Sequence, residues 1–326
     1  MSGPILPPLG GRAVIAGKLA VSGILLAVLL WRVDRVAFLR SLTSIPPVLF
    51  LGCVLLYGAS YILSTLRWRV LLRAAGIRLS LGRLLVIYFE AAFFNLFLPT
   101  LIGGDIVRGV FIYRATQGHD SALPSILLDR ISGFAAMLLI ALTALGLNYP
   151  RIQDPHIAVL LVGVVFAFGL SVFLLIDASM QALLFRLLHK IGLTRFETKL
   201  QGMADALRQY RHHPRVLWQA FGFSVLLQVL LIVTYSLVGD ALHLRIPLLD
   251  YFVFVPLVNV VAMLPVSIAG LGVRESGVVY FFAKAGVDAS AALGMSLIWF
   301  SLTLIVCGAG GLIFLFDQHL LKRTAS

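Results

Sequence analysis

The chain has 326 residues, of which 60% are hydrophobic and only 12% are charged, and its formal net charge is +12. Because soluble domains usually carry about a quarter charged residues, this composition excludes a folded soluble domain of any size. The basic residues lie between apolar stretches, which is typical of membrane orientation and anionic-lipid contact and not of nucleic-acid binding. The sequence therefore predicts an all-α polytopic membrane protein with a single membrane domain over residues 1–326, and no nucleic-acid partner.

Six stretches reach the roughly 20 apolar residues that a spanning helix needs. The first is followed by Arg32 and not by a small-residue cleavage site, which indicates a retained span and not a signal peptide. The predicted spans are Ala13–Trp31, Pro46–Leu66, Ile131–Tyr149, Ile157–Ile176, Val216–Val238 and Ala289–Phe316.

Two further apolar segments, Leu84–Leu101 and Tyr251–Ile268, are interrupted by proline and glycine and then resume as short helix-like pieces. Proline and paired glycine end a helix, and backbone freed inside a bilayer must be buried in protein or line a wet cavity. We therefore predict two re-entrant helical hairpins, over residues 84–116 and 251–285.

The basic loops predict the orientation of the chain. Arg67–Arg83 and Asp177–Arg215 are the richest in arginine and lysine, so both are expected in the cytoplasm, as are both termini. An even number of crossings must separate these loops. The hairpin 84–116 must then enter from the cytoplasmic side, and the hairpin 251–285 from the outer side.

The two broken segments share one order of residues. The first contains Asn95, Pro99, Gly103, Gly104 and Arg108, and the second contains Asn259, Pro265, Gly270, Gly272 and Arg274. Interrupted segments at corresponding places in two halves point to a transporter binding site. We predict an inverted repeat whose halves, 1–176 and 216–316, flank a cytoplasmic linker at 177–215 and precede a tail at 317–326.

The linker contains two predicted amphipathic helices, since apolar residues recur every three or four positions from Leu183 to Ile191 and again from Phe196 to Tyr210. Two arrangements stay open. The helices either lie on the inner leaflet and contact anionic lipids, or form a short soluble hairpin that packs on the membrane domain.

Charges inside apolar spans cost at least about 2.5–3.5 kcal/mol, so they mark candidate functional residues. Arg108 and Arg274 follow the two breaks, where the free N–H groups of a half-helix and a guanidinium together suit a phosphate. Asp105 and Glu275 could cap their own helices or neutralise the adjacent arginine, and a purely structural role for each pair is the alternative.

Asp129 and Arg130 are adjacent in sequence, so on a helix they point about 100° apart and cannot simply pair with each other. We predict instead that Asp129 pairs with an arginine of a hairpin. Glu90 lies in the middle of a broken segment and is a candidate for proton coupling, or else lines a cavity. Asn95, Asn259 and Ser267 are expected to offer neutral hydrogen bonds to a headgroup.

Signatures of enzymes and metal sites are missing from the sequence. We find no phosphate-binding loop, no zinc motif and no serine-nucleophile motif, so neither a catalytic activity nor a cofactor is predicted. Cys53 and Cys307 both lie in apolar spans and predict neither a disulfide nor a metal site.

The series Asn95, Pro99, Gly103, Gly104, Asp105 and Arg108, then Asp129-Arg130, and the run Leu264–Glu275 resemble the flippase-like membrane region of lysylphosphatidylglycerol synthases. That family also occurs as stand-alone membrane proteins, and the resemblance covers nearly the whole chain. It implies a flippase of the bacterial inner membrane that moves a phospholipid, a hopanoid or a polyprenyl-linked lipid. Because the chain ends shortly after its last span, no aminoacyl-transfer domain is expected.

In this scheme the hairpin tips meet near the midplane, Arg108 and Arg274 hold the phosphate, and the halves rock to give alternating access. Two other functions stay open. One is a membrane glycosyltransferase using polyprenyl-phosphate sugars, for which Asp34 is the candidate acidic residue; the other is a non-transporting scaffold. The sequence leaves the lipid, the direction of transport, the energy source and homo-oligomerisation undecided.

Overall fold

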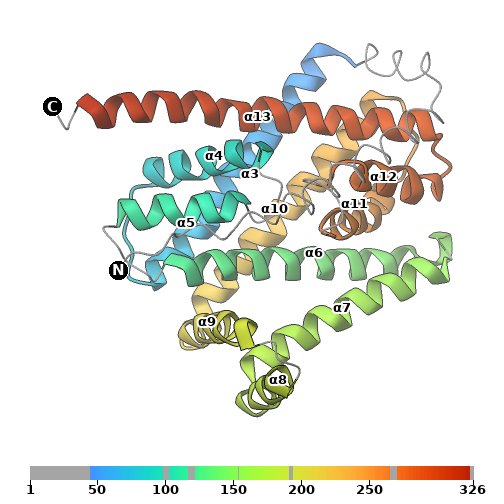
Figure 1. The fold of residues 1–326 in the computed structure, drawn as a ribbon. Helices are drawn as coiled ribbons and strands as arrows, with labels where there is room; N and C mark the ends of the chain where they lie inside the picture. Colours follow the sequence, from blue (N-terminus) through green and yellow to red (C-terminus); the bar gives the residue numbers. More distant parts are fainter. Residues whose placement is uncertain are drawn as a thin grey trace.

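The computed structural model describes residues 45–97, 103–116, 122–152, 154–190, 194–264 and 270–323. In these ranges all regular elements are helices (Figure 1). Five of them are long and apolar enough to cross a membrane: α3 (Pro47–Ala74), α6 (Ala122–Ile152), α7 (Pro155–Ile176), α10 (Pro214–Ala241) and α13 (Ala289–Arg323). The predicted all-α membrane protein is thereby confirmed. The sixth predicted span, Ala13–Trp31, lies outside the described residues.

Four shorter helices occupy the segments that proline and glycine interrupt: α4 (Leu81–Phe97), α5 (Gly103–Ala115), α11 (Leu248–Ala262) and α12 (Val273–Ala283). α4 packs on α5, and α11 packs on α12. A Cβ atom on Gly104 would lie 3.0 Å from the Ala91 carbonyl oxygen, and one on Gly270, whose φ is +75°, would lie 3.1 Å from that of Ala262. The glycines thus let the second helix of each pair begin close against the end of the first.

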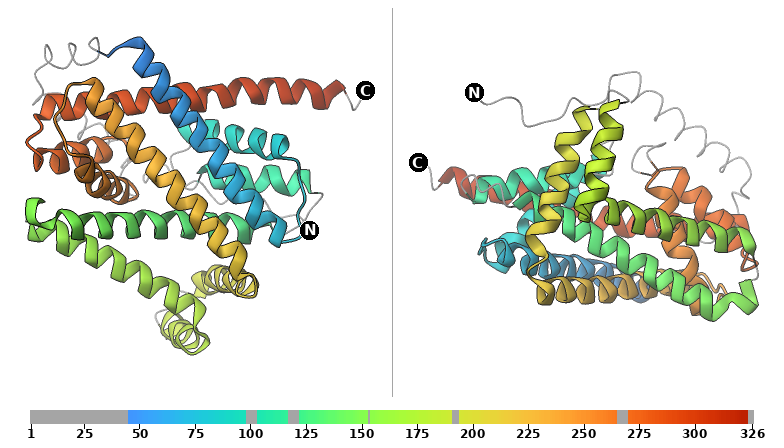
Figure 2. Two further views of the ribbon diagram at one scale, coloured as in Figure 1. Left: turned by 180° about the vertical axis from the view of Figure 1, so that it is seen from behind. Right: turned by 90° about the horizontal axis from the view of Figure 1, so that it is seen from below.

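The helices recur along the chain at a constant spacing. α3, α4 and α6 begin at residues 47, 81 and 122, and α10, α11 and α13 begin 167 residues later, at 214, 248 and 289. Contacts recur in the same way, because α3 packs on α10, α4 packs on α13, and α11 packs on α6. Each short pair therefore lies against the last long helix of the other half, and the crossing of α3 and α10 is visible in Figure 2.

Two groups of contacts mark opposite ends of the bundle. At one end, Tyr210 of α9 (Thr194–Tyr210) donates a hydrogen bond to the Leu71 carbonyl oxygen at 3.0 Å. At the other end, Lys284 lies 2.8 Å from Asp154, and Asn148 donates to Asp250 at 2.5 Å. These groups agree with the predicted topology, in which the loops at each end share one side of the membrane.

The linker forms two helices, α8 (Ala178–Lys190) and α9, as predicted. Both lie beside the end of the bundle rather than within it (Figure 1). Leu207 and Tyr210 of α9 are buried against Leu71 and Leu128, so α9 packs on the membrane domain. α8 keeps Leu183 44% exposed, and its last turn is basic.

Candidate functional site

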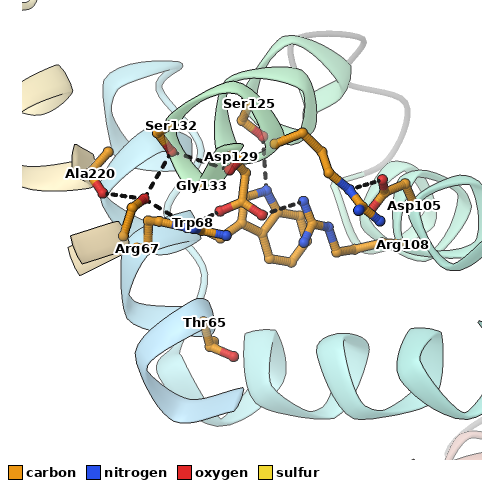
Figure 3. A network of polar contacts seen from close by, with 12 residues as sticks. Thr65, Arg67, Trp68, Asp105, Arg108, Ser125, Asp129, Ser132, Gly133 and Ala220 are labelled. Atoms are coloured by element: carbon orange, nitrogen blue, oxygen red, sulfur yellow. Dashed lines mark hydrogen bonds and ion pairs between the residues drawn. The ribbon is translucent and has the colours of Figure 1, made fainter. Parts of the chain in front are cut away.

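Three charged side chains from three different helices meet inside the bundle (Figure 3). Asp129 of α6 accepts a hydrogen bond from Arg67 Nε of α3 at 2.6 Å and one from Arg108 Nη2 of α5 at 3.0 Å. The exposed fractions of these side chains are only 3%, 7% and 4%, respectively. The predicted pairing of Asp129 with an arginine that follows a helix break is confirmed.

Arg67 was assigned by the sequence to a cytoplasmic loop, and that prediction is wrong. α3 continues to Ala74, because the segment from Arg67 contains neither proline nor glycine and consists mainly of residues that favour helices. Arg67 therefore lies within a long helix and is buried. A signal was present: Tyr57, Tyr61, Ser64 and Arg67 recur at helical spacing and form a polar stripe on an otherwise apolar span.

A glycine on α6 makes room for Arg67. A Cβ atom on Gly133 would lie 2.9 Å from Arg67 Nη1. The same Nη1 donates to Ser224 Oγ of α10 at 3.0 Å, and Ser224 donates to Ser132 Oγ at 3.2 Å. The charged cluster is thus tied to the second half of the chain.

Aromatic rings flank Arg108. Its guanidinium carbon lies 4.4 Å from the ring centre of Trp68 and 4.9 Å from that of Tyr88, which are cation–π distances. Trp68 Nε1 donates to Ser125 Oγ at 3.0 Å, so the indole is fixed. Arg108 Nε is buried and has no hydrogen-bond partner among the described residues. A buried donor of this kind costs free energy unless a ligand or water satisfies it.

A second ion pair lies beside the first, between Asp105 of α5 and Arg130 of α6. Asp105 Oδ2 lies 2.6 Å from Arg130 Nε, and the side chains are 14% and 47% exposed. Asp105 therefore pairs with neither Arg108 nor its own helix end. The start of α5 is bonded by Asn95 instead, whose Oδ1 accepts from the Gly104 N–H at 3.1 Å.

Two cavities adjoin these charges. The larger, of about 240 Å³, is lined by Ser64, Arg67, Tyr88, Asp105, Arg108, Asp129, Arg130, Gly133, Phe134, Met137, Leu227, Gln228 and Met263. The smaller, of about 150 Å³, is lined by Tyr61, Tyr88, Ala91, Ala92, Asn95, Gly104, Asp105, Arg108 and Arg130. Their walls together carry three guanidinium groups and two carboxylates, so one positive charge is in excess.

The second half carries a different set at the corresponding positions. By the spacing of 167 residues, Arg108 and Asp129 correspond to Glu275 and Ser296. Glu275 pairs with Arg274, accepts from the Gly272 N–H at 2.6 Å, and lies 3.5 Å from Ser296 Oγ. Glu275 therefore fills both of the roles considered for it, helix capping and neutralisation of its neighbour. Arg274 lines neither of the two cavities.

The remaining predicted residues are not brought into this site by the described structure. Asn259 is half-buried on α11, and Glu90 is 3% exposed on α4; neither lines the two cavities. Pro99, Pro265, Ser267 and Asp34 lie outside the described residues. Within the described part of the chain, no group of three or more histidine, cysteine or acidic side chains could hold a metal ion.

Comparison with known proteins gives two similarities. Residues 15–311 match the family described as the lysylphosphatidylglycerol synthase TM region. The chain is also 23% identical over 310 residues to a protein of Methanothermobacter thermautotrophicus named "UPF0104 membrane protein", and the match covers 89% of each chain.

Proposed function

The chain belongs to the family of the transmembrane region of lysylphosphatidylglycerol synthases, and from this premise we propose that it is a flippase that moves a phosphate-bearing lipid between leaflets. The observation that carries the proposal is the cluster of Arg67, Asp129 and Arg108 in the wall of a cavity between membrane helices. The proposal includes no catalytic step, no cofactor and no metal.

The charges of the cavity support an anionic guest. Burying a charged side chain in a membrane protein is expensive, so a cluster of several marks a functional position. Arg130 and Asp105 neutralise each other, whereas Arg67 and Arg108 share the single carboxylate of Asp129. A phosphate would supply the missing negative charge, and a guanidinium binds phosphate with directed hydrogen bonds.

The short helices support a route through the bilayer. α4, α5, α11 and α12 have 17, 13, 15 and 11 residues, all fewer than the roughly 20 needed to cross the hydrocarbon. We propose that each pair is a re-entrant hairpin and that the two hairpins enter from opposite faces. The constant spacing of 167 residues and the reciprocal packing of α4 on α13 and α11 on α6 support this inverted repeat. Rocking of one half against the other would then expose the cavity to each side in turn.

We place the protein in a bacterial inner membrane, with the end of the bundle that carries α8 and α9 in the cytoplasm. The linker is rich in arginine and lysine, which favours that side. α8 follows directly after α7, exposes Leu183 and ends in His189 and Lys190, so we propose that it contacts anionic lipids at the inner surface.

Reconstitution tests the flippase. Purified protein is placed in vesicles, and fluorescent phospholipids are followed between leaflets with a membrane-impermeant quencher. We expect phospholipid movement well above that of protein-free vesicles, and we expect Arg108→Gln to reduce it at least tenfold. Arg114→Gln is the matched control, because Arg114 is exposed on the same helix and lines neither cavity. Failure of the protein to accelerate any phospholipid would overturn the proposal.

A further inference from the structure

We infer that the site selects a headgroup with one net negative charge and neutral hydroxyl groups, such as a glycerol phosphodiester, and rejects a headgroup that carries a lysyl ammonium. This inference rests on the proposed function, since it names the class of lipid that the same cavity accepts. It also separates this chain from the aminoacylated lipid for which its family is named.

The first step is the count of charges. The two carboxylates that line the cavities are already paired, Asp105 with Arg130, and Asp129 with both Arg67 and Arg108. One guanidinium charge is left over in a largely buried wall. A monoanionic phosphodiester neutralises it, whereas a zwitterionic headgroup would bring a cation for which these walls hold no unpaired carboxylate.

The second step concerns aromatic rings, which could otherwise hold an ammonium group by cation–π contact. The guanidinium of Arg108 already lies over the faces of Trp68 and Tyr88. Tyr61 stacks on Phe89, with ring centres 5.2 Å apart. The rings near Arg108 are thus engaged and form no aromatic box for choline or a lysyl group.

The third step places the phosphate and the rest of the headgroup. Arg108 lines both cavities and keeps a buried Nε donor without a partner among the described residues, so the phosphate belongs against this side chain. The smaller cavity adds the Tyr61 hydroxyl, the Tyr88 hydroxyl and the Asn95 amide, all of which are uncharged. These groups suit hydrogen bonds with the hydroxyls of glycerol or of a sugar.

Binding and movement are measured separately, so that the two ideas can fail independently. For binding, the thermal unfolding midpoint of the full chain in an uncharged detergent is titrated with dihexanoyl phosphatidylglycerol, phosphatidylcholine and lysylphosphatidylglycerol. Glycerophosphoglycerol, which lacks acyl chains, distinguishes a lipid from a free phosphodiester. We expect phosphatidylglycerol to bind at least tenfold more tightly than each of the other three. Arg108→Gln should abolish this preference, and Arg114→Gln should keep it.

Equal or tighter binding of lysylphosphatidylglycerol or phosphatidylcholine would overturn the inference, and equal binding of glycerophosphoglycerol would overturn its lipid part. These comparisons use the wild-type chain, so they do not depend on how well a variant folds. In vesicles, equal movement of all three lipids would refute the headgroup class and leave the flippase standing. Selective binding of phosphatidylglycerol without movement of any lipid would support the class and refute the flippase.

Discussion

Asp129 is the single carboxylate between two buried guanidinium groups, and this sharing decides which substitution in the cluster is the most harmful. Removing Asp129 leaves Arg67 and Arg108 buried together without a counter-charge. Removing one arginine leaves a neutral pair. Breaking a buried ion pair from one side costs about 3–5 kcal/mol, because an uncompensated charge stays behind.

We therefore expect Asp129→Asn to lower stability by about 3–5 kcal/mol, and Arg67→Gln to lower it by about 1–2 kcal/mol. The measurement is unfolding of the purified variants in detergent, followed by circular dichroism. A larger loss for Arg67→Gln than for Asp129→Asn would contradict the shared-carboxylate arrangement.

Gly133 permits a second test at the residue scale. In Gly133→Ala the new methyl group would meet Arg67 Nη1, which is the end of a flexible side chain but is held by Ser224 and lies beside Asp129. We expect the fold to survive, stability to fall by about 1 kcal/mol, and phosphatidylglycerol binding to weaken. Gly146→Ala is the matched control on α6, because nothing lies within 4 Å of its Cβ position. That change should be neutral or stabilising, since alanine favours helix over glycine. Equal effects of the two changes would argue against the role of Gly133.

The residues of the site could be predicted from sequence only in part. Arg108, Asp129 and the pairing between them follow from helix geometry and from the cost of an intramembrane charge. Arg67 did not follow, because counting basic residues between spans assigns every arginine near a span end to a loop. The end of α3 is set by the absence of a helix breaker before Gly76, which lies at φ +81°. Hydropathy alone does not report that boundary.

At the scale of elements, the breaks and the two short helix pairs could be predicted, but their register could not. Sequence order aligned Arg108 with Arg274, whereas the helix starts align Arg108 with Glu275. The chain leading into α12 includes a turn with Gly270 and Gly272 at positive φ, whereas α5 begins directly at Gly103 and Gly104. A motif therefore keeps its order while its spacing shifts by one residue, and on a helix that turns the side chain by about 100°.

The loops at one end of the bundle are joined by Asp154 and Lys284, which gives an element-scale prediction. Asp154 Oδ1 caps α7 by accepting from the His156 N–H, and Oδ2 lies 2.8 Å from Lys284 Nζ. This hydrogen bond holds the pKa of Asp154 below its usual 3.8 and the pKa of Lys284 above its usual 10.5. Stability from the pair is present between these values. It is lost as pH falls through the lowered pKa of Asp154 or rises through the raised pKa of Lys284.

Asp154→Asn removes the charge and keeps a good helix cap, so it isolates the ion pair. We expect the wild-type chain to unfold at a slightly higher temperature than the variant, by a constant margin from about pH 5 to pH 9. The margin should shrink below pH 3.8 and above pH 10.5, and high salt should reduce it, because the pair is exposed. A margin that grew as the pH fell would contradict this assignment.

At the scale of the whole molecule, the repeat places two unlike charged sites near opposite ends of the bundle. Asp129 lies seven residues after the start of α6, and Ser296 lies seven residues after the start of α13. Each position is about 10 Å along its helix. The two helices begin at opposite ends of the molecule (Figure 1). The site at Arg108 therefore lies toward the end with α9, and the site at Arg274 and Glu275 lies toward the other.

A path between these sites gives the last prediction. Tyr61 lines the smaller cavity, and Tyr57, whose ring packs against Tyr61, accepts a hydrogen bond from Thr303 of α13 at 3.3 Å. We expect Arg274→Gln to slow phospholipid movement at least tenfold while leaving phosphatidylglycerol binding unchanged, because binding uses the cavity at Arg108. Arg245→Gln, at an exposed position in the same half of the chain, is the control and should change neither quantity.

The two sites make separable contributions only if each is reached in turn, so the comparison of binding with movement is decisive. Unchanged movement in Arg274→Gln would show that lipid passes without the second half-site. Loss of binding together with movement would show that Arg274 acts through the fold around the first cavity. Loss of movement alone would fit a headgroup that is held first by Arg108 and released past Arg274 near the opposite leaflet.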